Sequence, residues 1–316
     1  MIKVSKSLPD ISVLRGGKKD FKQSLSEGGE VLASLTKIGY KPLDVLIEKN
    51  GEWTANGKPT DAHEVFTRSH TVVDTTRMKG EKYQKLASEM GIPLIFSHAD
   101  EMKLDREDMY RILRQKGFKV PKTSVIRASA PIKDSVFREI WSTYHTPLMV
   151  RPLEKINDSP SKLIKLFNDL EKIVREYHEN GIDVHILTYK KAPTSSIGIL
   201  PNFRGEKIYT PIWVETFASI GDIPNQDSPM RAHMNAPDFR KDQMKQFVTE
   251  VYEALNLSGP VCIDMIPYEY DYMVVNVDTT PSLSKDGRFM KSLATTGVDA
   301  GEYVHSLVQN DYILDK

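Results

Sequence analysis

Cysteine is nearly absent from this chain of 316 residues, which contains Cys262 alone. An internal disulfide is therefore excluded, as in proteins of a reducing compartment. Cys262 lies in an apolar segment, so we expect it to pack in the core rather than to act as a nucleophile. Long hydrophobic runs are missing too. No stretch reaches the roughly 20 apolar residues that span a bilayer, and residues 1–12 lack a signal-peptide core. We expect a cytoplasmic protein with no membrane partner.

The chain also lacks an excess of either charge. Its 43 Lys and Arg residues balance 43 Asp and Glu residues, so no global field attracts nucleic acid or an anionic surface. Binding to nucleic acid is disfavoured, and a basic binding cleft would have to be local. With 40% hydrophobic residues, the chain can bury a large core, and its length predicts two or three domains.

Strands and helices alternate along the sequence, which predicts an α/β fold. A strand, a glycine turn and a helix over 11–36 open an N-terminal α/β domain, which we place at residues 1–98. A central α+β domain follows at 99–184, and a C-terminal domain at 185–316. The main further predictions are a helix over 161–179, a strand over 207–215 and a long loop over 218–235 of the kind that forms lids.

A hairpin over residues 261–278 is predicted to gather metal-ligand side chains. With a turn near Tyr270, Asp264 lies across from Asn276, and Asp278 shares that face. Hard oxygen ligands of this kind suit Mg²⁺. From the spacing alone, a hairpin with a solvated polar face explains the pattern equally well. The opposite face is predicted to carry Met273, Val275 and Val277.

The sequence around these candidate metal ligands resembles that of a known family. Residues 275–284, VNVDTTPSLS, resemble the Glu-Val-Asn-Thr-x-Pro-Gly-x-Thr segment of the D-alanine:D-alanine ligases, which belong to the ATP-grasp superfamily. Similar matches recur in the same order at 13–17, 104–106, 150–152, 202–206 and 263–265. The resemblance implies an ATP-grasp architecture, in which an N-terminal parallel-sheet domain and two α+β domains enclose a cleft.

The resemblance also implies a chemistry and a set of site residues. Two lysines that contact ATP phosphates in the family match Arg106 and Arg151, and the metal ligands match Asp264, Asn276 and Asp278. Mg²⁺ and ATP are the implied cofactors. The implied reaction, part of peptidoglycan biosynthesis, joins the carboxylate of D-alanine or a similar small molecule to an amine through an acyl phosphate. A homodimer is implied as well.

Several nucleotide-binding positions depart from the family pattern. The phosphate-covering glycine loop matches residues 154–160, which contain no glycine. Glycine permits close approach of the backbone to a ligand, so this loop is not expected to cradle phosphate. The hinge glutamates that hold adenine and ribose are replaced as well. The matching residues are Leu187, Thr188, Tyr189, Ala192, Pro193 and Thr194.

Catalytic positions depart too, so no catalytic residue is assigned. Cys262 stands where the family has an arginine that stabilises the developing oxyanion. Residues 77–81 replace a histidine-containing segment, and Asp20 is the only carboxylate close after the first glycine turn. Arg288 is a candidate for binding a carboxylate.

Three hypotheses remain open. The chain is a ligase of this class, a non-catalytic paralogue that acts as a binding or regulatory protein, or an ATP-grasp enzyme for another acid and amine. The two hypotheses of an ATP-dependent ligase both require a particular arrangement of the site residues. Asp264, Asn276 and Asp278 should converge, with Arg151 facing them across a cleft.

Overall fold

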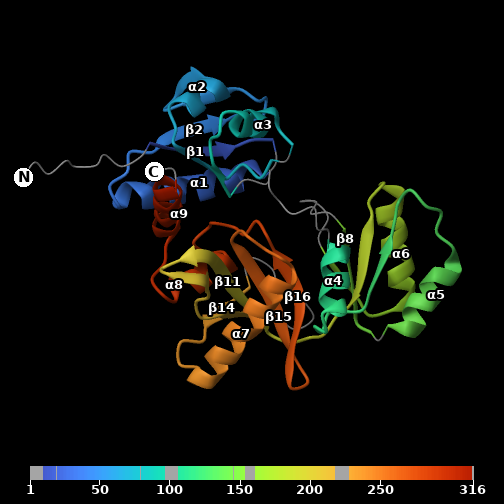
Figure 1. The fold of residues 1–316 in the computed structure, drawn as a ribbon. Helices are drawn as coiled ribbons and strands as arrows, with labels where there is room; N and C mark the ends of the chain where they lie inside the picture. Colours follow the sequence, from blue (N-terminus) through green and yellow to red (C-terminus); the bar gives the residue numbers. More distant parts are fainter. Residues whose placement is uncertain are drawn as a thin grey trace, which may run out of the picture.

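The computed structural model describes residues 10–18, 20–78, 80–96, 106–144, 146–153, 161–217 and 228–314, with side chains up to residue 309. Within these ranges the chain forms one sheet in each third of the sequence, and helices pack beside each sheet (Figure 1). In the described part of the chain, no helix is long and apolar enough to cross a membrane. The predicted loop 154–160 and most of the predicted lid, 218–227, lie outside these ranges.

The N-terminal sheet has the strand order β4-β3-β2-β1-β5-β6. Its core strands are parallel and almost wholly buried, which explains their unbroken apolar sequence. The strands are β1 (Ile11–Gly16), β2 (Leu43–Ile47), β3 (Trp53–Ala55), β4 (Lys58–Thr60), β5 (Thr71–Asp74) and β6 (Leu94–Ile95). The helices are α1 (Phe21–Lys37), α2 (Ala62–Thr67) and α3 (Lys82–Glu89).

A glycine turn after β1 sets the direction of α1. Gly16 has φ 90°, and a Cβ at this position would lie 2.3 Å from the carbonyl oxygen of Ile47. The Gly16 amide donates to the Ser24 hydroxyl at 2.8 Å, and the Gly17 amide donates to the Ile47 carbonyl at 2.7 Å. Only glycine fits this close approach, and α1 is thereby aimed at the C-terminal third of the chain.

The central sheet is antiparallel, in the order β7-β10-β8-β9. The prediction of one helix over 161–179 was wrong at its start, because β9 pairs with β8 as an edge strand before α6 begins. β10 belongs to this sheet, while the domain limits at 98 and 184 stay predictions. The elements are α4 (Arg106–Gln115), β7 (Thr123–Ile126), α5 (Asp134–Thr143), β8 (Leu148–Pro152), β9 (Lys162–Ile164), α6 (Phe167–Glu179) and β10 (Val184–Thr188).

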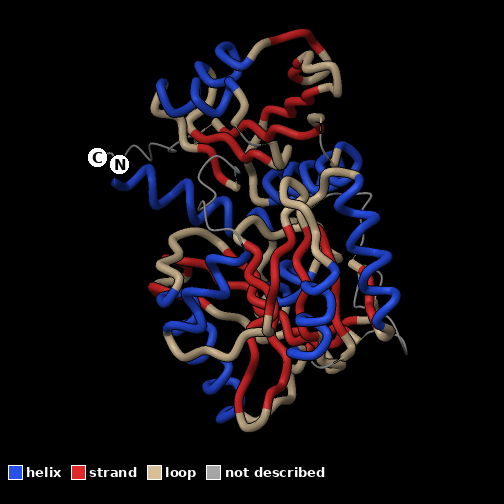
Figure 2. The backbone as a smooth tube through the Cα atoms, turned by 90° about the vertical axis from the view of Figure 1, so that its right-hand side faces the viewer, coloured by secondary structure: helices blue, strands red, loops and turns tan. Residues whose placement is uncertain are grey.

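The C-terminal sheet runs β14-β13-β11-β15-β16, with β12 paired to β11. Figure 2 shows the strands of the chain in red with helices, in blue, packed around them. The strand predicted over 207–215 is divided in the structure, and Pro211, which has no N–H to donate, lies in the break. The elements are β11 (Thr194–Phe203), β12 (Glu206–Tyr209), β13 (Val214–Thr216), β14 (Met230–Ala232), α7 (Asp238–Ala254), β15 (Val261–Tyr268), β16 (Asp271–Asp278), α8 (Arg288–Ala294) and α9 (Ala300–Leu314).

One hydrophobic core joins the two ends of the chain. Val31 and Leu35 of α1 share a buried cluster with Phe289 of α8 and with Tyr303 and Val304 of α9. The last helix therefore returns to pack on the first (Figure 1). The N-terminal sheet is thus held directly against the C-terminal domain.

Two helical glycines test how closely α9 and α1 pack. A Cβ at Gly301 would lie 2.7–2.8 Å from backbone and side-chain atoms of Ser34, whereas a Cβ at Gly29 would have nothing within 4 Å. We expect Gly301→Ala to lower the free energy of unfolding by about 1–3 kcal/mol through overpacking. Gly29→Ala should raise it by up to about 1 kcal/mol through helix propensity. Urea denaturation measures both, and equal effects of the two substitutions would contradict the close contact.

Candidate functional site

A cleft of about 260 Å³ lies between the central sheet and the C-terminal hairpin. β8 and β10 of the central sheet supply one wall, while β15 and β16 supply the other. The sequence-predicted residues Arg106, Arg151, Asp264, Asn276 and Arg288 all line it. Arg151 thus lines the same cleft as Asp264 and Asn276, while Asp278 is not among the lining residues. The convergence of all three ligands with Arg151 stays a prediction.

Two arginines meet on the central-domain side of the cleft. Burial, and then the like charge of Arg151, lowers the pKa of Arg106 to about 10. Arg151 donates from Nη2 to the Tyr110 hydroxyl at 3.2 Å, and its Nε is buried without a partner in the described part of the chain. Among those residues, no carboxylate forms an ion pair with either guanidinium. Two like charges thus face one cleft with little compensation, which favours an anion there.

His185 lies behind these arginines as a neutral side chain. It is fully buried, pairs with Arg151 across the β8–β10 ladder, and packs against the Tyr110 ring at 5.7 Å between centroids. Burial, Arg151 and Arg106 together lower its pKa to about 3. Neither ring nitrogen has a hydrogen-bond partner among the described residues. His185 therefore adds no charge to the cleft. Protonating it in acid would destabilise the folded protein.

Asp264 is the buried negative charge on the opposite wall. Its Oδ1 accepts the Ser196 hydroxyl proton at 2.6 Å, and Oδ2 accepts from Asn276 Nδ2 at 3.2 Å. Arg288 Nη1 donates to the same Oδ2 at 2.8 Å. The Asp264 charge is the main cause of the raised pKa of Arg288. An arginine from the first turn of α8 thus neutralises this carboxylate.

The hairpin register agrees with the predicted pairing but contains a bulge. Asp264 pairs with Asn276 as predicted, and the turn falls at residues 269–270. The register then shifts, so that Met265 pairs with Val274 and Val275 is the extra residue. A bulge reverses the facing of the residues beyond it. The prediction that Met273 and Val275 point away from Asn276 was therefore wrong, since both line the cleft with it.

Asp278 and Cys262 pair across the two strands at the end of this face. Asp278 lies near enough to Arg106 to offset part of the lowering of its pKa, and it contributes to the raised pKa of Arg288. Cys262 is buried, as expected for core packing, and its pKa is raised by burial and by Asp264. The thiol is therefore neutral. The matching family arginine has no substitute on β15, but the Arg288 guanidinium reaches this neighbourhood from α8.

A resident Mg²⁺ does not fit this arrangement of side chains. Mg²⁺ needs open carboxylate oxygens, whereas the Asp264 oxygens accept from Ser196, Asn276 and Arg288. Within the described ranges, no group of three or more His, Cys, Asp or Glu side chains could hold a metal ion. A metal would have to displace the Arg288 cation first. The metal site at Asp264, Asn276 and Asp278 stays a prediction.

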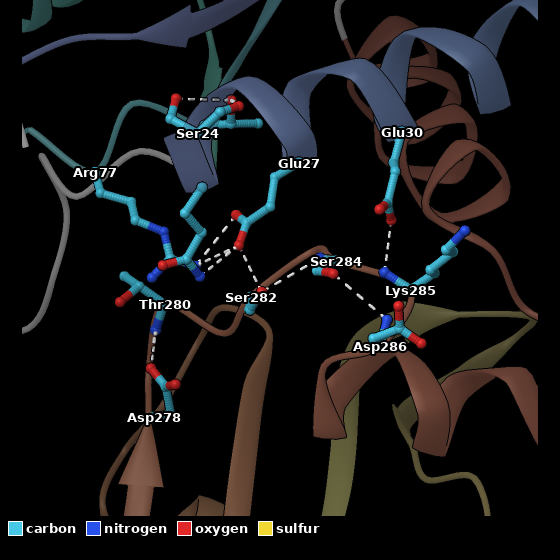
Figure 3. A network of polar contacts seen from close by, with 12 residues as sticks. Ser24, Glu27, Glu30, Arg77, Asp278, Thr280, Ser282, Ser284, Lys285 and Asp286 are labelled. Carbon is cyan, nitrogen blue, oxygen red and sulfur yellow. Dashed lines mark hydrogen bonds and ion pairs between the residues drawn. The ribbon is translucent and has the colours of Figure 1, made fainter. Parts of the chain in front are cut away.

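Sequence reasoning missed a buried carboxylate in the N-terminal domain. Asp20 was singled out as the only nearby acid, but Glu27 of α1 is 2% exposed and points toward the loop after β16 (Figure 3). It pairs with Arg77 at 2.8 Å and accepts the Ser282 hydroxyl proton at 2.5 Å. The helical spacing that places Glu27 on the buried face with Val31 was a usable signal.

The stability of the protein should depend on the protonation of His185. In the unfolded state His185 binds a proton below pH 6.5, whereas in the folded state it binds one only below about pH 3. The free energy of unfolding therefore decreases as the pH is lowered from 6.5 to 3. We expect a loss on the order of 2 to 3 kcal/mol from pH 7 to pH 4.5. His185→Leu should remove most of this loss in urea titrations, and exposed His63→Gln should leave it unchanged. An unchanged slope in His185→Leu would contradict the assignment.

Arg288 should control whether a divalent cation binds. We expect millimolar Mg²⁺ to leave the melting temperature of the wild type unchanged, because Arg288 occupies Asp264 Oδ2. Arg288→Ala should gain a saturable Mg²⁺-dependent rise, and Arg288→Lys, which keeps the cation, should not. Equal Mg²⁺ binding by all three proteins in calorimetry would show that Arg288 does not compete with the metal.

Comparison with known proteins places this geometry in context. No family model matches the chain. The vancomycin/teicoplanin A-type resistance protein VanA of Enterococcus faecium is 20% identical over 342 residues, which cover 94% of this chain and 97% of VanA. The D-alanine–D-alanine ligase of Actinobacillus succinogenes is 24% identical over 318 residues, covering 95% and 96% of the two chains.

Solved structures of proteins with these activities are also similar to this chain in fold. A D-alanine–D-alanine ligase from Bacillus anthracis has a TM-score of 0.75 at 16% identity, covering 97% of this chain and 98% of that one. The VanG D-Ala:D-Ser ligase from Enterococcus faecalis has a TM-score of 0.74 at 15% identity, covering 96% and 99%. The chain is therefore similar to these ligases in sequence at a low level, and it has the fold of the D-alanine–D-alanine ligase structures along nearly its whole length.

Proposed function

We propose that the cleft binds a small polyanion, with phosphate-type groups held by Arg106 and Arg151. The observation that carries this proposal is the pair of neighbouring guanidinium groups in the cleft, with which no carboxylate of the described residues forms an ion pair. The charge of Arg151 contributes to the lowered pKa of Arg106, and Arg151 Nε lacks a partner among the described residues. An anion between the two would satisfy both at once. The planar forks of arginine suit phosphate oxygens.

The rest of the cleft adds positive charge and an apolar wall. Lys190 and Arg288 line it as well, so four cationic side chains face one lining carboxylate, Asp264. Next to them, Met149, Leu187, Ile266 and Met273 form an apolar surface. This combination suits a phosphate group attached to an organic ring, and the nucleotide implied by the likeness to ligases has that composition. The hinge positions at 187–189 supply no carboxylate to hold a ribose.

We favour a binding or regulatory role without dipeptide synthesis. Transition-state stabilisation in acyl transfer needs an available positive charge at the reacting centre. Cys262 is neutral there, and the charge of Arg288 is already engaged by Asp264. Losses within one cooperative site do not add simply, so a few substitutions suffice to abolish turnover. A cytoplasmic location and a homodimer remain predictions.

A second candidate is an ATP-dependent ligase acting on a different acid and amine. The side-chain exposure of Arg288, 39%, favours it, because the guanidinium reaches the cleft while paired to Asp264. In this case Arg106 and Arg151 would neutralise phosphate charge, and Arg288 would orient the substrate carboxylate. The substrate carboxylate would attack the γ-phosphoryl group of ATP, forming an acyl phosphate and releasing ADP, and an amine would then displace phosphate from the acyl carbon and lose a proton to form the amide.

Inorganic pyrophosphate is the direct probe of the anion site. We expect saturable binding in calorimetry, with Arg106→Gln and Arg151→Gln each weakening it about 10- to 100-fold through the loss of a charge-assisted contact. Arg138→Gln, on the exposed face of α5, is the matched control and should bind like the wild type. The absence of binding at millimolar pyrophosphate would refute the anion site.

Phosphate release separates the two candidates. We expect no phosphate release from ATP that depends on D-alanine or other small amino acids, with or without Mg²⁺. Release that depends on an added acid and amine, and that Arg151→Gln abolishes, would establish the ligase and remove the non-catalytic reading.

A further inference from the structure

The loop over residues 279–287 begins and ends at charged residues beside the anion cleft. Asp278 ends β16 directly before it, and Arg288 begins α8 directly after it. The charge of Asp278 is close enough to offset part of the lowering of the Arg106 pKa, and Arg288 pairs with Asp264 at 2.8 Å. A movement of this loop would therefore change the distances of the Asp278 and Arg288 charges from Arg106. The position of the loop matters to the cleft even where the loop itself does not line it.

The middle of this loop packs through Leu283 in the shared core, and its polar contacts run to the N-terminal domain (Figure 3). Ser282 Oγ donates to Glu27 Oε1 at 2.5 Å, and the backbone N–H of Lys285 donates to Glu30 Oε2 at 2.5 Å. Glu27 and Glu30 lie three residues apart on α1, so both carboxylates leave the same face of the helix. One helix face thus grips two points of the loop.

Glu27 is a fixed anchor because its charge is buried and compensated. Arg77 Nη2 donates to both of its oxygens, at 2.8 and 3.1 Å, and Gln23 Nε2 donates at 2.9 Å. Side-chain exposure is 3% for Glu27 and 11% for Arg77. A buried pair of this kind costs much to open, since either partner alone would be an uncompensated charge. The Ser282 hydroxyl therefore donates to a carboxylate that a buried ion pair holds in place.

Short local bonds make the loop stiff enough to transmit this anchoring. The Thr280 amide donates to Asp278 Oδ1 at 3.2 Å, and the Ser284 amide donates to Ser282 Oγ at 3.3 Å. The Gly287 amide donates to the Ser284 carbonyl at 2.8 Å. Toward Arg288 these contacts are continuous from Ser282 through Ser284 to Gly287. Toward Asp278, only Pro281 separates the anchored serine from Thr280, whose amide contacts the Asp278 carboxylate. Displacing Ser282 is therefore expected to shift both ends.

We propose that Glu27 and Glu30 are positioning residues for the anion site, acting through the loop 279–287 on Asp278 and Arg288. Anion binding and docking of α1 on the C-terminal domain are then coupled, so each strengthens the other. The proposal rests on the proposed anion-binding function. It adds that a domain without contact to the anion tunes the affinity for it.

Ser282→Ala is the cleanest test, because it removes one hydroxyl and leaves the Glu27–Arg77 pair intact. We expect pyrophosphate affinity in calorimetry to fall about 5- to 10-fold, and Glu30→Ala to have a similar effect. The matched controls are Ser142→Ala on α5 and Glu89→Ala on α3, both exposed and away from the loop. They should bind like the wild type.

A double-mutant cycle with Arg288→Ala distinguishes positioning from a general loss of structure. If the anchoring acts on the charges beside the cleft, Ser282→Ala should cost less than twofold once Arg288 is absent. An equal loss in both backgrounds would overturn the route through Arg288. Wild-type affinity in both Ser282→Ala and Glu30→Ala would overturn the coupling while the anion site stands. Failure of the wild type to bind pyrophosphate would overturn the anion site and the coupling together.

Discussion

The arrangement of the site depends on one ion pair, between the buried carboxylate of Asp264 and the partly exposed guanidinium of Arg288. Asp264 lies in the middle of the C-terminal sheet, where an isolated carboxylate would be very costly. Ser196, Asn276 and Arg288 satisfy it from three directions. The pairing fixes the start of α8, and with it the end of the loop that α1 grips. The same pairing occupies the oxygen atoms that a metal ligand would need to offer.

The two walls of the cleft solve the problem of buried charge in opposite ways. On the hairpin wall, negative and positive groups neutralise one another within the protein. On the central wall, Arg106 and Arg151 repel each other and His185 is held neutral behind them. Protein folding tolerates such a cost most readily where a ligand recovers it. The imbalance of charge lies on the central wall, which is the side of the cleft to which we assign the proposed anion site.

The N-terminal domain contributes a third element to this balance. Its helix α1 packs on α9 and shares a core with α8, while its carboxylates hold the loop between β16 and α8. Packing and polar contacts therefore act on the same segment.

The sequence predicted much of this molecule because strong local signals and a resemblance agreed. Alternation, glycine turns and apolar runs located most strands and helices, and the motif around residues 275–284 indicated the fold. The pairing of Asp264 with Asn276 followed from strand periodicity and the position of one turn. β9 was missed because its three residues become a strand only by pairing with β8, which is a tertiary contact.

By itself, then, the sequence determined the class of fold, the presence of the arginines and the opposition of the two hairpin residues. These properties depend on residue type and on short-range geometry. Only the tertiary structure decided which charges are compensated. Arg288 reaches Asp264 across 24 residues, and Ser282 reaches Glu27 across 255. Electrostatic pairing depends on distance in space, and sequence spacing does not report that distance.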